Sequence, residues 1–337
     1  MKESLKKYLF YITFSALGSF CAEVISTNYP LALLNPFIYL VYGLLYIFFI
    51  DALMRCKEKN FYIMYLFGFL VGIITETYVA KVTFYGLKPD EIRICGVSPG
   101  PILFVILFYH AFFSFLMPLY LAKRVLSFPL PITGKKRIDL LVMLIPFILL
   151  PAVYGQLISG HRNVLFLIGH MAISATVLFL WILLLRYTGE IKNILLSKKE
   201  RKYLLIFTVI IYIVFLLVGT NSAHGHKAMD IPVIPAVVIS AIIILILFFI
   251  FKVLKKNKEP EKEIACSPGN INLKLFFLWI FWHISVTAAV LIFQKVTGHI
   301  LLAGIPLLAI TGITLAVIFF ISSMFYLIKD LLRPQAL

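Results

Sequence analysis

Charged residues are scarce in this chain, and acidic ones are the scarcest. Charged side chains make up 14% of the 337 residues, whereas a soluble domain carries roughly a quarter. Only 15 Asp and Glu stand against 31 Lys and Arg, which leaves a net charge of +16. On a soluble domain this excess would indicate a nucleic-acid partner. Here the basic residues flank long apolar runs, so we expect a lipid bilayer as the partner and no nucleic acid.

The sequence also lacks the motifs of several enzyme classes. Its four cysteines form no Cys-x-x-Cys pair, which argues against a zinc ribbon or a thioredoxin-like motif. His-Glu-x-x-His does not occur, and no glycine-rich loop ends in the Lys of a phosphate-binding loop. No motif identifies a cofactor. These absences favour a transporter, a lipid-handling protein or an accessory protein over a familiar enzyme.

The strict alternation of apolar and polar residues that a membrane β-barrel requires is missing from long runs such as 231–254. About 20 mostly apolar residues cross a bilayer as a helix. The sequence therefore predicts an all-α, polytopic integral membrane protein with about ten transmembrane helices. The expected helices span residues 8–25, 31–54, 61–85, 100–122, 138–158, 163–187, 202–220, 231–254, 273–297 and 300–328. We expect one transmembrane domain over 1–337, with a cytoplasmic linker at 255–272.

The placement of the basic residues orients these helices. With the N-terminus in the cytoplasm, 25 of the 31 Lys and Arg fall on the cytoplasmic side and 6 on the outer side. This is the positive-inside pattern, and ten helices then place both termini in the cytoplasm. We therefore expect a multi-pass protein of the cell membrane of a prokaryote.

Glu76 is the strongest candidate for a functional residue, because an ionisable group within a bilayer is costly. It lies toward the outer end of the helix expected at 61–85, and Gly68 and Gly72 precede it on the same helical face. Such a stripe of small residues lets another helix or a ligand approach the backbone closely. Lys81 follows one turn later and is expected to pair with Glu76 or with another acid. The alternative is a buried acid that only holds two helices together.

Glu23 ends the first expected helix near the outer surface, above Ser15 and Ser19 at i−8 and i−4. If Glu23 and Glu76 meet, two carboxylates at similar depth would share a proton or flank a cation. The simpler interpretation of Glu23 is an interfacial acid in contact with water.

Histidines form a third group of candidates. His110 lies near the middle of the helix expected at 100–122, and Ser114 follows one turn later. His170 and His283 likewise precede a Ser or Thr by four residues. The simplest interpretation is that these side chains crosslink helices. Alternatively, His110 and His170 lie at equal depth as a bis-His haem or metal site would require, or His110 joins Glu76 and Glu23 in a metal or proton site.

Asp51 is a further ionisable group within an expected helix. It lies near the inner end of the segment 31–54, four residues before Arg55. An ion pair between neighbouring turns explains it without any functional role.

A set of mostly polar, aromatic and proline residues is spread over the first third of the chain: Glu23, Pro30, Asn35, Pro36, Tyr46, Arg55, Glu76, Lys81, His110, Ala111, Ser114 and Pro118. In this set, over residues ~20–120, the chain resembles an uncharacterised family of prokaryotic multipass membrane proteins. The resemblance implies a multipass membrane fold and no particular activity. It points to the same Glu and His residues that the cost of burial singles out.

These observations favour a transporter or permease-like protein with a polar site in the outer half of the membrane. Its ligand would be a small molecule, an ion or a lipid, held by Glu23, Glu76, Lys81, His110 and Ser114. One alternative is an intramembrane enzyme acting on a lipid or lipid-linked substrate, with Glu76 or His110 as the general base. The other is an accessory or structural subunit without a site of its own.

Overall fold

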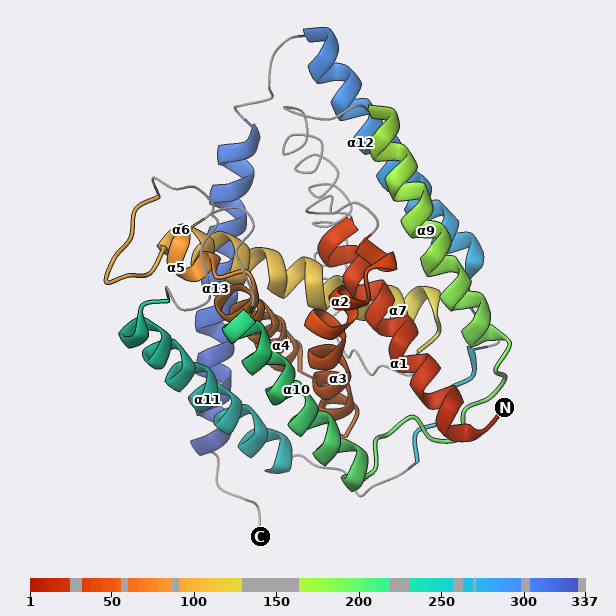
Figure 1. Cartoon of the computed structure of the whole chain (residues 1–337), viewed down its shortest axis with the longest axis horizontal. Helices are drawn as coiled ribbons and strands as arrows, with labels where there is room; N and C mark the ends of the chain where they lie inside the picture. Colours follow the sequence, from red (N-terminus) through yellow and green to blue (C-terminus); the bar gives the residue numbers. More distant parts are fainter. Residues whose placement is uncertain are drawn as a thin grey trace. The chain divides into compact units, whose positions relative to one another are not determined.

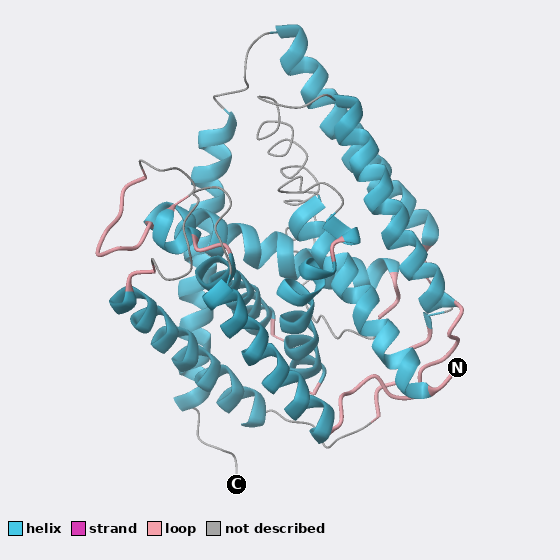
Figure 2. Ribbon diagram, viewed as in Figure 1, coloured by secondary structure: helices cyan, strands magenta, loops and turns pink. Residues whose placement is uncertain are grey.

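The computed structural model describes residues 1–24, 32–55, 60–86, 91–128, 164–218, 231–256, 263–268, 271–297 and 304–332. Within these ranges the chain is helical and has no strand (Figure 2), only two isolated bridges, Ile94 with Val97 and Ile191 with Cys266. The predicted all-α fold is therefore confirmed for the described residues. The chain divides into two compact units, each built from three stretches that lie far apart in the sequence.

Unit 1 comprises Met1–Ile47, Leu116–Leu195 and Glu263–Thr311. Its helices are α1 (Glu3–Ser19), η1 (Phe20–Val24), η2 (Ala32–Leu34), α2 (Pro36–Ile38), η3 (Tyr39–Gly43), α7 (Met117–Val125), α9 (Val164–Arg186) and α12 (Leu273–Thr297). In Figure 1, α9 lies alongside α1 and α12, and it contacts both helices. The hydroxyl of Thr13 on α1 donates to the carbonyl of Trp181 on α9 at 3.3 Å.

Unit 2 comprises Phe48–Phe115, Leu196–Lys262 and Gly312–Leu337. Its helices are α4 (Phe61–Ile74), η4 (Thr75–Val79), α5 (Val82–Tyr85), α6 (Pro99–Pro101), α10 (Lys198–Val218) and α11 (Val233–Lys256). Three further helices cross the division between the units: α3 (Leu44–Met54), η5 (Ile102–Leu116) and α13 (Gly304–Leu332). The Tyr65 hydroxyl of α4 lies 2.9 Å from the carbonyl oxygen of Leu107 in η5 and 2.8 Å from that of Ala316 in α13.

Helix ends follow local sequence signals. Asn35 caps α2, since its side-chain oxygen accepts from the Phe37 amide at 3.0 Å, and Pro36 occupies the first helical position. Asn60 caps α4 in the same way, through the Tyr62 amide at 2.8 Å. These caps satisfy backbone donors that the first helical turn leaves unpaired.

The observed helices lie close to the expected ranges, with one clear difference. The helix expected at 61–85 ends at Val79, and the chain turns at Lys81, whose φ is 60°. Four residues of α5 follow this turn. The helix expected at 138–158 lies outside the described residues, and the expected linker 255–272 is described only in part. The single domain over 1–337 and the count of ten helices stay predictions.

Six helices among the described residues are long and apolar enough to cross a membrane. They are Pro36–Met54, Phe61–Val79, Pro99–Val125, Ile168–Arg186, Val233–Lys256 and Ile310–Leu332. In Phe61–Val79, 83% of the most apolar window is buried inside the protein, whereas in Val233–Lys256 only 22% is buried. The first is therefore a central helix of unit 2, and the second presents an apolar face that lipid would cover.

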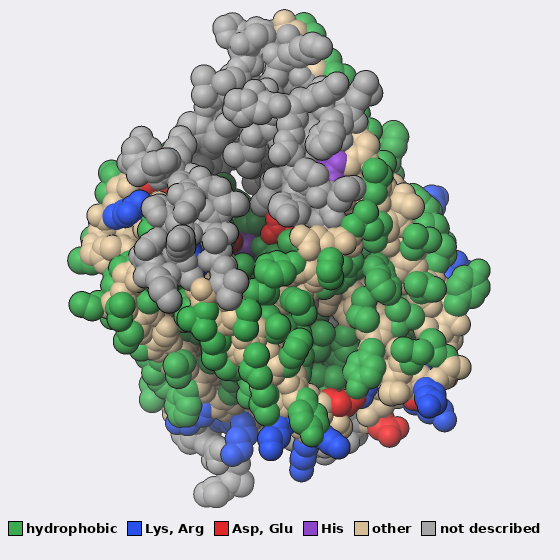
Figure 3. Space-filling view, in the orientation of Figure 1, with side chains coloured by type: hydrophobic (Ala, Val, Ile, Leu, Met, Phe, Trp, Pro, Cys, Tyr) green, Lys and Arg blue, Asp and Glu red, His purple; other side chains and the backbone are tan. Residues whose placement is uncertain are grey.

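Basic residues gather at one end of α10 and α11 in unit 2. Lys198, Lys199, Arg201 and Lys202 begin α10, and Lys252, Lys255 and Lys256 end α11. Figure 3 shows Lys and Arg along this end and apolar side chains over the rest of the two helices. This is the arrangement that the positive-inside orientation requires of two antiparallel spans.

Candidate functional site

The side chains of Glu76 and His110 form a buried pair in unit 2. Nε2 of His110 lies 2.7 Å from Oε1 of Glu76. Only 8% of Glu76 and 2% of His110 are exposed. With a proton on Nε2 the imidazole donates to the carboxylate, and a second proton on Nδ1 makes the contact an ion pair.

Two glycines bring the backbones of this pair together. A Cβ added to Gly72 would lie 2.6 Å from the Cβ of His110, and one added to Gly68 would lie 2.7 Å from the carbonyl oxygen of Ala111. Side chains at these positions would push η5 away from α4. The close approach expected from the small-residue stripe is therefore confirmed, and its partner is the segment that carries His110.

Both members of the pair lie in π-helical segments. Glu76 is in η4, and His110 is in η5. Glu23 of unit 1 lies in a third such segment, η1. The π-helix, with i→i+5 hydrogen bonds, is rare and is found frequently at functional sites. Three of the ionisable candidates, Glu23, Glu76 and His110, are thus carried by this unusual backbone.

Local hydrogen bonds shape the turn that holds Glu76. The hydroxyl of Thr75 lies 2.8 Å from the carbonyl oxygen of Val71 and 3.1 Å from that of Gly72. The Ala80 amide donates to the Thr75 carbonyl, five residues back, at 3.0 Å. A Thr hydroxyl that bonds its own helix competes with the regular ladder and bends the helix. We therefore attribute the local widening of the helix at Glu76 to Thr75.

Lys81 lies directly after this turn and is fully buried. Its left-handed backbone, with φ 60° and ψ 14°, is uncommon for a residue other than glycine and ends the helix there. The hydroxyls of Thr77 and Thr83 lie 3.2 Å apart across the turn, and the Ser98 amide donates to the Thr83 carbonyl at 2.8 Å. These bonds fix the segment that follows Glu76 against the loop before α6.

Ser114 is fully buried on η5, the segment that carries His110. Its distance from His110 along the chain is four residues, which is one turn of an α-helix. In a π-helical segment the bonded turn spans five residues. The expectation that Ser114 acts with His110 stays a prediction.

Glu23 lies in unit 1 and is half-buried. The hydroxyl of Tyr42, in the π-helical segment η3, donates to Oε1 of Glu23 at 2.5 Å. The helices meet closely below the pair, since a Cβ on Gly43 would lie 3.0 Å from the hydroxyl oxygen of Ser15. Tyr42 was not singled out by the sequence, because a tyrosine carries no cost within a membrane helix that would draw notice. A shared site for Glu23 and Glu76 stays a prediction, since each acid has its own partner in its own unit.

His170 and His283 are both buried in unit 1, on α9 and α12. The His283 ring packs edge-on against Trp279 at 5.3 Å between ring centres. His110 and His170 belong to different units, and Nε2 of His110 is engaged by Glu76. Among the described residues, no three His, Cys, Asp or Glu lie close enough together to hold a metal ion.

Comparison with known proteins bears on the whole chain. No curated protein and no solved structure matches it. A family model does match, over residues 12–333, and its description is an uncharacterized membrane protein family. The match extends well beyond residues 20–120, which carry the resemblance to an uncharacterised multipass membrane family. Because the match covers most of its length, the chain belongs to this uncharacterized membrane protein family.

Proposed function

We propose that this protein is a transporter or permease-like protein of the cell membrane, and that Glu76 and His110 bind its proton or cation. The observation that carries the proposal is the 2.7 Å contact between the two side chains, which joins the two most buried apolar spans among the described residues. A purely structural crosslink between two helices needs no titratable group on either helix. A pair that exchanges protons needs a titratable group on each helix.

The pair can hold zero, one or two protons beyond the neutral imidazole with its carboxylate. Each proton changes the charge of a buried site by one unit, and such a change is costly in a low-dielectric environment unless the surroundings move. Protonation is therefore a means to bias one arrangement of α4 and η5 against another. Lys81, fully buried at the turn after η4, places an amine five residues past Glu76.

The π-helical backbone supports the same conclusion. A segment with i→i+5 bonds exchanges with an α-helical arrangement by shifting its hydrogen-bond register, which rotates the side chains that follow. Glu76 and His110 both lie in such segments. A register shift in η4 or η5 would therefore separate the two side chains without unfolding either helix.

The experiment is proton flux into proteoliposomes that contain purified protein, driven by a potassium diffusion potential and read with an internal pH dye. We expect flux through the unmodified protein and through the surface control Glu190→Gln. Glu76→Gln and His110→Gln should each reduce the flux at least tenfold, because each removes one proton acceptor. Unchanged flux in Glu76→Gln, or no flux in the unmodified protein, contradicts the proposal.

One observation favours a second candidate, an intramembrane enzyme acting on a lipid-linked substrate. A carboxylate bonded to an imidazole nitrogen is the arrangement that orients a histidine as a general base. The two functions differ in the lipid extract of a deletion strain. An altered lipid composition, restored by the unmodified gene and not by His110→Gln, would favour the enzyme.

A further inference from the structure

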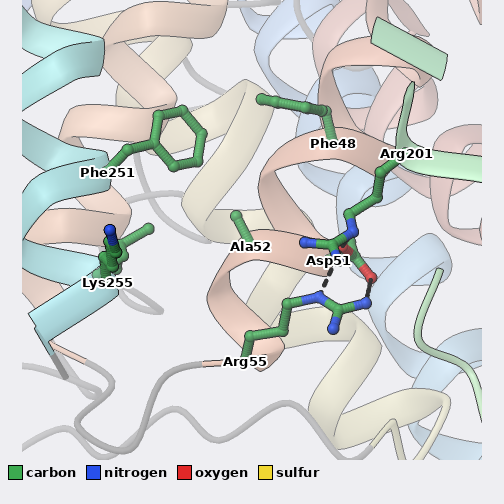
Figure 4. Close-up of a pocket in the computed structure, with 8 residues that line it drawn as sticks. Phe48, Asp51, Ala52, Arg55, Arg201, Phe251 and Lys255 are labelled. Atoms are coloured by element: carbon green, nitrogen blue, oxygen red, sulfur yellow. Dashed lines mark hydrogen bonds and ion pairs between the residues drawn. The ribbon is translucent and has the colours of Figure 1, made fainter. Parts of the chain in front are cut away.

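A pocket of about 220 Å³ opens at the basic end of unit 2, away from Glu76 and His110. Its lining includes Phe48, Asp51 and Arg55 of α3, Arg201 of α10, and Phe251 and Lys255 of α11. Figure 4 shows Arg55 and Arg201 on two sides of Asp51, with Lys255 and Phe251 on the facing helix. We call it the basic pocket.

Asp51 organises the floor of the basic pocket and is almost fully buried, at 2% exposed. Nε and Nη2 of Arg55 donate to its two carboxylate oxygens at 2.9 and 3.1 Å. The Leu196 amide donates to Oδ1 at 2.8 Å. The predicted ion pair of Asp51 with Arg55 is confirmed, and it also fixes the backbone that leads into α10.

The start of α10 is held rigidly beside this carboxylate. Ser197 and Glu200 form a capping box, in which the Ser197 amide donates to Glu200 at 2.7 Å and the Glu200 amide to the Ser197 hydroxyl at 3.2 Å. Arg201 follows immediately, with its Nε 3.9 Å from Oδ2 of Asp51.

The charges of the basic pocket do not balance. Arg55, Arg201 and Lys255 face a single carboxylate, and Arg55 already neutralises it with a bidentate contact. Lys255 is exposed and has no hydrogen-bond or ion-pair partner within the described part of the chain. Among the residues that line the pocket, three cations therefore stand against one carboxylate, and this excess of positive charge attracts an anion.

The inner wall of the pocket is apolar. The rings of Phe48 and Phe251 pack edge-on, 5.7 Å apart between centres. Phe48 precedes Arg55 by seven residues, which places it about 10 Å deeper along the helix. Phe251 likewise precedes Lys255 by one turn. Cations thus lie at the helix ends and aromatic rings lie toward the membrane interior.

We propose that the basic pocket binds the phosphate headgroup of an anionic membrane lipid from the leaflet on the basic side of the protein. Basic pockets between transmembrane helices on this side recognise such headgroups. The volume of about 220 Å³ is below the ~300–1,000 Å³ of pockets that enclose a whole drug-sized ligand. It suits a phosphate and its glycerol, with the acyl chains running along Phe48 and Phe251 on the lipid-facing side.

The test is a titration of purified protein in neutral detergent with dioleoyl phosphatidylglycerol, read as the shift in thermal unfolding, beside phosphatidylcholine and inorganic phosphate. The variant Arg201→Gln/Lys255→Gln removes two pocket cations. We expect it to bind phosphatidylglycerol about 30-fold more weakly, from the contribution of each basic residue near an anionic surface. The matched control Lys202→Gln/Lys252→Gln removes two exposed cations of the same helices that do not line the pocket, and it should bind as the unmodified protein does.

Two results would overturn the proposal. Equal weakening in the pocket variant and the control would show that general attraction to a basic surface is sufficient. Equal stabilisation by inorganic phosphate would assign the pocket to a free anion instead of a lipid. If the double variant does not fold, Lys255→Gln alone leaves the partners of Asp51 in place and should weaken binding about 5-fold.

Discussion

Glu23 of unit 1 and Glu76 of unit 2 are alike in three respects. Each lies in a π-helical segment at the end of a longer helix. Each accepts from a side chain in another π-helical segment, Tyr42 for the first and His110 for the second. Each follows a stripe of small residues against which the partner helix packs. The two units thus use the same plan to hold an acid between two helices.

The two pairs differ in burial and in the chemistry of the partner. Glu23 is half-buried, and its partner Tyr42 offers a single hydroxyl. Glu76 is buried, and its partner His110 offers an imidazole, whose two ring nitrogens can each carry or accept a proton. The first pair therefore suits a fixed hydrogen bond, whereas the second suits proton exchange. Variants that break each pair test this difference.

The largest difference is expected between His110→Ala and Tyr42→Phe. Removal of the imidazole leaves a buried carboxylate without this partner, which should lower the free energy of unfolding by about 3 kcal/mol. Removal of the phenol hydroxyl costs one hydrogen bond to a half-buried acid, about 1 kcal/mol. Unfolding in detergent, followed by circular dichroism against temperature and denaturant, measures both.

His110→Gln is the matched variant for this measurement, because its amide can still donate to Glu76. It should recover most of the stability that alanine loses, while proton flux stays low. If His110→Ala and Tyr42→Phe lose the same stability, the two pairs are equivalent structural contacts and the contrast between the units is wrong.

Glycine substitutions should produce the next largest contrast. A Cβ on Gly72 would lie 2.6 Å from the Cβ of His110 and 3.2 Å from the backbone of Ile106. Because backbone must shift, Gly72→Ala should cost about 1–3 kcal/mol. A Cβ on Gly43 would lie 3.0 Å from Oγ and 3.1 Å from Cβ of Ser15, and no backbone atom is among its three nearest neighbours. These contacts are less close than those at Gly72, so Gly43→Ala should cost less, about 1 kcal/mol.

Gly169 supplies the control for both substitutions. It lies within α9, and a Cβ there has no heavy atom within 4 Å. Gly169→Ala should leave stability unchanged or raise it by up to about 1 kcal/mol, since alanine favours the helix. A cost at Gly43 equal to that at Gly72 would contradict the view that only the second pair rests on direct backbone packing.

The sequence predicted the components of the buried site better than their contacts. The cost of an ionisable group in a membrane singled out Glu76 and His110 separately, and the stripe of Gly68 and Gly72 predicted a close helix partner. Nothing in a periodicity of 3.6 residues shows that His110 faces this stripe. The π-helical segments shift the face that each residue occupies, so the pairing depends on backbone geometry that the sequence pattern does not express.

The other differences between the predicted and the observed structure also arise from backbone geometry and tertiary packing. The run from Val79 to Tyr85 is apolar apart from Lys81, so it predicted a continuing helix, although Lys81 takes a left-handed backbone usually left to glycine. The neighbours of Asp51 were predicted only within its own helix. Arg201 approaches it from α10, 150 residues further along the chain, and a contact at that separation follows from tertiary packing alone.

The smallest expected effect concerns one thiol in each unit. Cys95 of unit 2 is exposed, in the loop before α6, whereas Cys266 of unit 1 is buried. In variants that keep a single cysteine, a membrane-impermeant maleimide at pH 8 should label Cys95 within minutes and leave Cys266 unlabelled until the protein is denatured. Labelling of Cys95 from the outer side of intact cells also tests the predicted orientation.

Burial raises the pKa of the Cys266 thiol to about 12, against about 8.5 for an unfolded chain. The folded state therefore keeps this proton in the window where the unfolded state loses it. The contribution of the neutral thiol to stability is complete below about pH 8.5 and decreases as the pH rises toward 12. Cys266→Ala should make the unfolding free energy less dependent on pH between 9 and 11. An unchanged dependence in this variant would mean that the Cys266 loop does not keep its thiol from water.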